Sequence, residues 1–272
     1  MTLTISPQAL RSVADSIKKL NYVPSSWQQQ LAGFNDNVRK QLDEFLSRLV
    51  QEGGQPKLLA FVLEQLADQQ DAIYRERNSW SFVWSGPEAL HSKTADTFAT
   101  MDQLIKDAKH TLLISTFNIG LSTEFRELMK SIAKRLEAGQ LERVDLFFHP
   151  KQIENEISST PAGDKRRVKI REWFFGKDGV EGDVWKWPGR PHVYVDKRLI
   201  MGSDNYCFHH AKVVVADAKT SSSVALVTSA NFSEAAQRSN FEAGWLVRDT
   251  WRANQVSDHF KKMVMEKLFV EL

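Results

Sequence analysis

The 272-residue sequence is poor in cysteine, in long apolar runs and in any excess of one charge. Its single cysteine, Cys207, has no partner for an internal disulfide, so nothing indicates an oxidising compartment. No window holds about eighteen uninterrupted apolar residues, and residues 1–16 lack the apolar core of a secretory signal. We therefore expect no transmembrane helix, no membrane partner and a cytoplasmic location.

The charges nearly balance, with 36 Lys and Arg against 34 Asp and Glu. The resulting net charge of +2 does not predict a nucleic-acid partner, so any attraction for phosphate must come from a local cluster. Hydrophobic residues make up 42% of the chain and charged residues 26%, which is typical of a globular protein and excludes a disordered chain.

Residues 1–79 have the apolar spacing of α-helices and are predicted to form a helical amino-terminal domain. Ser6 and Pro7 mark the start of the first helix, and Ser25 or Ser26 precedes the second. The predicted helices cover about residues 7–20, 26–49 and 56–78. This part contains no residue pattern that indicates catalysis, and we interpret it as a packing or partner-binding module.

Residues 80–272 alternate between strand and helix patterns, which favours an α/β sandwich with helices on both faces of a sheet. The predicted strands cover about residues 81–85, 111–117, 143–148, 192–195, 210–216, 224–229 and 242–247. The predicted helices cover about residues 94–109, 123–138, 165–174 and 251–269. This part is predicted to be the catalytic domain.

Three polar pairs, each separated by two positions, mark the carboxy-terminal half. The pairs are His210 with Lys212, Ser229 with Asn231, and Asn240 with Glu242. Side chains at i and i+2 share one face of a strand, so three neighbouring strands are expected to present a polar pair on a common face.

These residue types suit the cleavage of a phosphodiester. An imidazole can attack phosphorus covalently, and an ammonium can neutralise the charge that grows on the phosphate. Hydroxyl and amide groups can hold the non-bridging oxygens, and a carboxylate can hold the required imidazole tautomer. This scheme requires no cofactor and no metal ion, and Cys207 with His209 makes a poor zinc site.

The pattern His210-x-Lys212-x-x-x-x-Asp217, followed by Ser229-x-Asn231, resembles the HKD motif of the phospholipase D superfamily. The resemblance covers about residues 80–272. It implies a phospholipase-D-like α/β sandwich with a mixed central sheet. Asp217 stands at the opposite strand parity from His210, so we expect it to position the loop or the lysine and not to touch phosphate.

The resemblance also assigns roles within the candidate site. It implies that His210 is the nucleophile, that Lys212 and Asn231 bind phosphate, and that Ser229 assists. Glu242 is then the expected group that orients His210.

Two further His-x-Lys triplets are not expected to be catalytic. Phe98 stands where the first, His91-Ser-Lys93, would need an aspartate, and Pro150 interrupts the second, His149-Pro-Lys151. We expect both to be surface histidines beside lysines.

A basic segment with interleaved aromatic residues is the candidate nucleic-acid-binding surface. Its basic residues are Lys165, Arg166, Arg167, Lys169 and Arg171. Such a segment can follow a phosphate backbone while neighbouring aromatic rings stack on bases. A solvated helix face followed by core tryptophans would give the same pattern, and the sequence does not distinguish the two.

One good motif supplies half of a two-histidine site, because phosphohistidine chemistry needs a second group to protonate the leaving oxygen. We therefore predict a two-fold homodimer that brings two His210 side chains face to face.

The order of a helical part, Trp84-Ser-Gly-Pro87 and one HKD motif resembles the phospholipase-D-like component of the bacterial DISARM anti-phage system. The resemblance implies a metal-independent nuclease that acts on nucleic acid, in the first place DNA, and binds defence proteins through its amino-terminal helices. The alternatives are a lipid-cleaving phospholipase and an inactive nucleic-acid-binding or scaffold subunit. The sequence does not distinguish DNA from RNA, or single from double strands.

Overall fold

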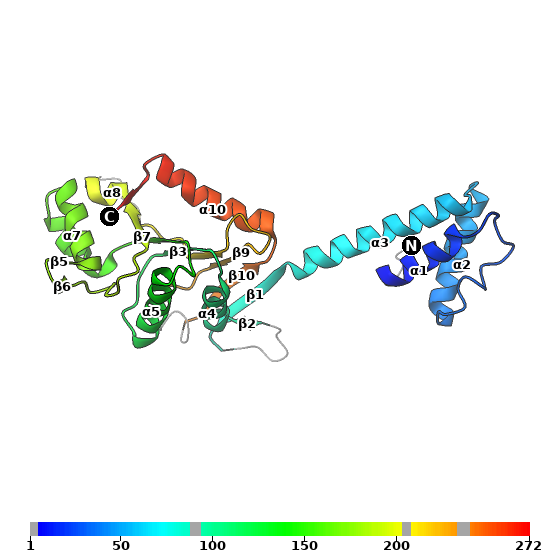
Figure 1. Ribbon diagram of the computed structural model, residues 1–272, viewed down its shortest axis with the longest axis horizontal. Helices are drawn as coiled ribbons and strands as arrows, with labels where there is room; N and C mark the ends of the chain where they lie inside the picture. Colours follow the sequence, from blue (N-terminus) through cyan, green and yellow to red (C-terminus); the bar gives the residue numbers. More distant parts are fainter. Residues whose placement is uncertain (1–4, 88–93, 203–207, 233–239) are drawn as a thin grey trace. The chain divides into compact units, whose positions relative to one another are not determined.

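The computed structural model describes residues 5–87, 94–202, 208–232 and 240–272. The chain forms two compact units, Met1–Asn78 and Ser79–Leu272, whose elements are labelled in Figure 1. Within the described ranges, no helix has both the length and the apolar character needed to cross a membrane.

Three helices build the described part of the first unit. They are α1 (Pro7–Lys18), α2 (Asp36–Gln51) and α3 (Pro56–Asn78). Ser6 caps α1 as predicted, but α2 is capped by Asn35 and begins later than the sequence pattern suggests. The Ser26 hydroxyl accepts a hydrogen bond from the Gln28 amide within a turn, so it does not start a helix.

The apolar stripes of the three helices meet in one core. Its fully buried members include Leu10, Ile17, Leu31, Leu46 and Leu63. Each such side chain contributes about 1.5–3 kcal/mol when it leaves water, which is why the amphipathic pattern sets the fold of this unit.

A mixed sheet of nine strands forms the centre of the second unit within its described part, in the order β11-β7-β4-β3-β8-β9-β10-β1-β2. The strands are β1 (Trp80–Ser85), β2 (Ala95–Asp96), β3 (Thr111–Thr116), β4 (Arg143–Phe148), β7 (His192–Asp196), β8 (Val213–Ala216), β9 (Val224–Thr228), β10 (Glu242–Val247) and β11 (Phe269–Glu271). β3, β4 and β7 are parallel, whereas β8, β9 and β10 continue the sheet in antiparallel fashion.

Helices cover both faces of this sheet. On one face lie α4 (Thr97–Asp107), α5 (Thr123–Glu137) and α7 (Asp164–Phe175), and α10 (Thr250–Met265) covers the other (Figure 1). Alternating strand residues separate the two cores: Val214 packs in the first and Val215 in the second. The predicted α/β sandwich with a mixed sheet, preceded by helices, is confirmed.

The second unit also contains short elements that the sequence pattern did not predict. They are the 3₁₀ helix η1 (Lys151–Ile153), α6 (Glu154–Ser159), the hairpin β5 (Gly176–Lys177) and β6 (Val180–Glu181), and α8 (Lys197–Met201). The last helix ends at Met265, which leaves room for β11 at the outer edge of the sheet. β8 begins at Val213, so His210 and Lys212 lie in the segment just before the strand.

Candidate active site

The three polar pairs converge at one edge of the sheet. In the strand register Ser115 pairs with Val213, Val213 with Val227, and Thr228 with Gly244. The end of β3, the start of β8, the end of β9 and the start of β10 therefore lie side by side. The segments 210–212, 229–231 and 240–242 extend from these strand ends, so strand pairing brings together residues far apart in the sequence.

His210 and Lys212 are in direct contact. The Lys212 Nζ atom lies 2.6 Å from Nδ1 and 3.1 Å from Nε2 of His210. A lysine ammonium only donates hydrogen bonds, so this contact requires an unprotonated ring nitrogen. Lys212 is 5% exposed, whereas His210 is exposed at the edge. A buried cation therefore stands beside an accessible imidazole.

Electrostatics keep the imidazole neutral. The pKa of His210 is lowered from its ordinary value, first by burial and then by the charge of Lys212, while Glu242 opposes the shift. Burial also lowers the pKa of Lys212, again against the effect of Glu242. A neutral imidazole keeps a lone pair, which is the form that a nucleophile needs.

Glu242 is held by the neighbouring strand end. The Ser229 hydroxyl donates a hydrogen bond to its carboxylate, and the Asn240 amide donates at 3.4 Å. The Ser229 Oγ atom in turn accepts from the Ala243 amide at 3.1 Å. Glu242 therefore acts on His210 through its charge, while its hydrogen bonds fix it to Ser229 and Asn240. Asn231 is half-buried, three positions after the end of β9.

Aromatic rings that the sequence reasoning missed support the imidazole. Phe117 lies 4.8 Å from the His210 ring and stacks on His149 at 5.2 Å between ring centres. The expectation that His149 is a surface histidine was wrong, because its side chain is 1% exposed. Phe117 and His149 directly follow the paired ends of β3 and β4. Their position after two predicted strands could have identified them as candidate site residues. His91 lies outside the described residues.

His209 anchors the segment that contains His210. Its Nε2 atom lies 2.8 Å from the Ser115 hydroxyl, which donates to the Ala211 carbonyl at 2.9 Å. Because that hydroxyl has a single hydrogen, its oxygen must accept from Nε2–H of His209. Burial lowers the pKa of His209 to about 4, so it is neutral near pH 7. The contact ties the residues around His210 to β3.

Residues 101–264, more than half of the chain, match the family described as "Cardiolipin synthase, PLD-like domain". The chain belongs to this PLD-like family. Members of the phospholipase D superfamily are phosphodiesterases. No curated protein matches the sequence significantly.

Solved structures resemble this PLD-like chain at low identity. NucT from Helicobacter pylori is 16% identical with a TM-score of 0.44, over 71% of this chain and 99% of that chain. Nuc from Salmonella typhimurium, a phospholipase D family member, is 13% identical with a TM-score of 0.43, over 71% and 97%. Phosphatidylserine synthase from Haemophilus influenzae Rd KW20 is 15% identical with a TM-score of 0.43, over 78% and 47%.

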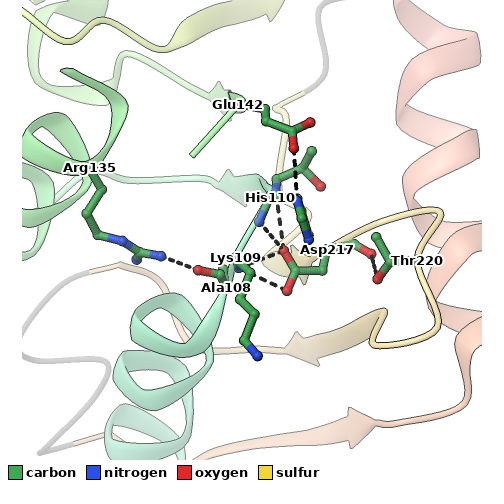
Figure 2. Close-up of polar contacts among 8 residues, drawn as sticks. Ala108, Lys109, His110, Arg135, Glu142, Asp217 and Thr220 are labelled. Carbon is green, nitrogen blue, oxygen red and sulfur yellow. Dashed lines mark hydrogen bonds and ion pairs between the residues drawn. The ribbon is translucent and has the colours of Figure 1, made fainter. Parts of the chain in front are cut away.

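Asp217 of this PLD-like domain lies away from the site, at the opposite end of β8. Its carboxylate accepts hydrogen bonds from the backbone amides of Lys109, His110 and Thr111, at 2.7–3.2 Å for its Oδ1 atom (Figure 2). It lies five positions after Lys212, which is roughly 16 Å along an extended strand. Asp217 therefore holds the loop that enters β3 and does not contact the histidine–lysine pair.

The basic segment forms most of α7, and three of its side chains are used inside the PLD-like domain. Arg166 donates to the Thr160 and Leu199 carbonyls, Arg167 donates to the Glu271 carbonyl, and Lys169 pairs with Glu156 at 2.6 Å. The remaining two, Lys165 and Arg171, are exposed. The nearby aromatic residues Trp173, Phe174, Trp185 and Trp187 pack in or against the core.

Proposed function

We propose that this PLD-like chain is a phosphodiesterase that cleaves nucleic acid through a phosphohistidine intermediate. The contact between exposed His210 and buried Lys212, at an edge shared with Ser229 and Glu242, carries this proposal. It places a neutral imidazole next to a buried cation. This combination suits attack on an anionic phosphorus centre.

The first step is attack by a ring nitrogen of His210 on phosphorus. An N–P bond forms, the P–O bond to the leaving group breaks, and its electron pair remains on the leaving oxygen. Lys212 has three N–H donors, so it can turn its donation from the imidazole to the phosphate oxygens as negative charge grows there. Asn231 and Ser229 are the further phosphate-binding groups in this scheme.

The second step returns the enzyme to its starting state. Water attacks phosphorus, the N–P bond breaks, and the electron pair returns to the imidazole while the water loses a proton. The leaving oxygen must gain a proton in the first step and water must lose one in the second. We assign both transfers to His210 of a second copy across a two-fold axis. That second imidazole starts the cycle protonated and the attacking one neutral, so it can donate its proton in the first step and recover one from water in the second. A monomer with full activity, shown by light scattering at the assay concentration, would contradict this assignment.

Charge supplied by Lys212 allows the reaction to proceed without a divalent metal ion. Among the described residues, no group of three His, Cys, Asp or Glu could hold a metal ion. We expect cleavage to persist in a chelator at the rate seen with magnesium. Complete loss of activity in EDTA that magnesium restores would refute metal independence.

Exposed cations and the defence-system resemblance favour nucleic acid as the substrate and anti-phage defence as the setting. Lys165 and Arg171 of α7 remain available for a phosphate backbone. The apolar side chains of Leu58, Phe61 and Tyr74 are exposed on α3, and this exposure supports a protein partner at that helix. We propose that these apolar side chains dock other proteins of a DISARM-type system, as the resemblance to its component DrmC implies.

The decisive experiment compares the wild-type chain with His210→Ala on labelled single-stranded DNA, double-stranded DNA, RNA and phosphatidylcholine vesicles. We expect the wild type to cleave a nucleic acid and His210→Ala to lose at least about 10³-fold in rate, because removing a covalent nucleophile leaves only binding effects. His110→Ala is the matched control, since this half-exposed histidine pairs with Glu142 at the opposite end of β3.

Each outcome of this panel identifies a different function. Undiminished cleavage by His210→Ala refutes the assignment of His210 as the nucleophile. Cleavage of vesicles alone makes the chain a phospholipase. Binding of nucleic acid without cleavage by the wild type makes it an inactive binding or scaffold subunit.

A further inference from the structure

A cavity of about 520 Å³ adjoins the candidate nucleophile on the α10 side of the sheet. His210 forms part of its wall, and the other walls include Phe208, Phe260, Met263 and Phe269. Cavities of roughly 300–1,000 Å³ with apolar, aromatic walls and a few polar groups are typical of small-molecule sites. The position beside His210 makes this cavity a candidate for one part of the substrate.

The direction of the attack decides which part that is. In an in-line displacement the leaving oxygen lies opposite the attacking nitrogen, so the leaving group points away from His210. The group that stays on phosphorus lies to the side, close to the imidazole. A cavity whose wall contains His210 therefore suits the substituent that remains in the phosphohistidine intermediate.

Cations lie at another part of the cavity wall. Lys197 and Arg198 begin α8, directly after β7. Arg198 is paired with buried Asp196 at 2.5 Å, whereas Lys197 is exposed and makes no ion pair within the ranges that the structure describes. Two strands separate β7 from β8, so Lys197 lies about 14 Å from His210 by strand spacing alone.

A nucleoside inside a nucleic-acid strand carries a phosphate on each side, and this distinguishes it from the diacylglycerol of a simple phospholipid. One phosphate at Lys212 and the next near Lys197 would span the cavity, with the flat base against its aromatic walls. We propose that this cavity holds the nucleoside retained on phosphorus. The proposal rests on the proposed nuclease function and specifies its substrate as an unpaired nucleotide, because a base stacked in a duplex cannot enter a pocket.

The test fills the cavity and changes the substrate. Met263→Trp places an indole in the cavity wall, and Met265→Trp is the matched control, because Met265 is 79% exposed on the same helix and outside that wall. The substrates are thymidine 5′-(4-nitrophenyl phosphate), which retains thymidine, and methyl 4-nitrophenyl phosphate, which retains a methyl group. We expect Met263→Trp to lower kcat/KM about tenfold or more for the thymidine substrate only.

A second variant covers the case in which Met263→Trp fails to fold. Lys197→Ala removes an exposed side chain, with Lys261→Ala as the control on the surface of α10. Binding of single-stranded oligothymidylate is measured on the His210→Ala background at several salt concentrations. We expect Lys197→Ala alone to reduce the salt dependence of binding by about one phosphate contact.

The outcomes separate this inference from the nuclease proposal. If Met263→Trp folds and leaves both substrates unaffected, or impairs both equally, the cavity does not hold the retained nucleoside. If it instead impairs hydrolysis of phosphatidylcholine, the cavity holds an acyl chain and the inference is wrong. If the wild type cleaves neither the small substrates nor DNA or RNA, the nuclease proposal fails, and thymidine 5′-monophosphate binding that Met263→Trp abolishes still supports the pocket.

Discussion

Acidification is expected to destabilise the PLD-like unit, Ser79–Leu272, through one residue, His209. This imidazole is 8% exposed, donates to the Ser115 hydroxyl and packs edge-on against Phe269 at 5.1 Å. Burial lowers the pKa of His209 to about 4, opposed by the charge of Asp196. In the unfolded chain the same group is expected to titrate at about 6.5.

The loss of unfolding free energy follows from the pKa values of His209 in the folded and the unfolded chain. Between pH 6.5 and 4 the unfolded chain binds a proton that the folded chain does not, so acid favours unfolding. The contribution of a neutral His209 is fully present above pH 6.5 and is lost as the pH falls toward 4. At ~1.4 kcal/mol for each pH unit between the two values, the loss is roughly 2 kcal/mol at pH 5 and about 3 kcal/mol at pH 4.

Urea unfolding followed by tryptophan fluorescence measures this loss. Trp27 is the one tryptophan outside residues 79–272, so the signal reports mainly on the PLD-like unit. His209→Gln keeps an N–H donor for Ser115 but cannot titrate. We expect it to remove the extra acid sensitivity of the wild type between pH 7.5 and 4, whereas His110→Gln does not. Parallel loss of stability in the wild type and His209→Gln would refute the reasoning.

Two further predictions concern His210 and Asp217. Lys212→Met should raise the pKa of His210 and move the acid limb of activity to higher pH, because Lys212 lowers that pKa. Glu242→Gln should instead lower the pKa of His210 further, because Glu242 raises it. NMR titration of the His210 ring checks both signs, and shifts of the two variants in the same direction would contradict the account. Asp217→Asn should cost about 1–3 kcal/mol in urea unfolding, because an amide replaces an oxygen that accepts buried backbone hydrogen bonds, and it should leave the His210 titration unmoved.

The sequence by itself determined the chemistry available and the class of fold. The pattern of His210, Lys212, Ser229 and Glu242 indicates a phosphodiester site on its own, because the reactive groups are side chains of fixed type. Strand and helix spacing predicted most elements, since apolar periodicity depends on local geometry. Local pattern could not place the start of α2, where Asn35 replaces Ser26 as the cap.

Only the tertiary structure decided which side chains meet. β3 pairs with β8, about a hundred residues further along the chain, and this pairing brings Phe117 and His149 to the site. The same strand, β8, carries Asp217 to its opposite end, where its carboxylate binds backbone amides. Arg166 and Arg167 are likewise used by carbonyls distant in sequence. Periodicity fixes the face on which a residue lies, but the partners across that face come from strand order, which depends on burial over the whole domain.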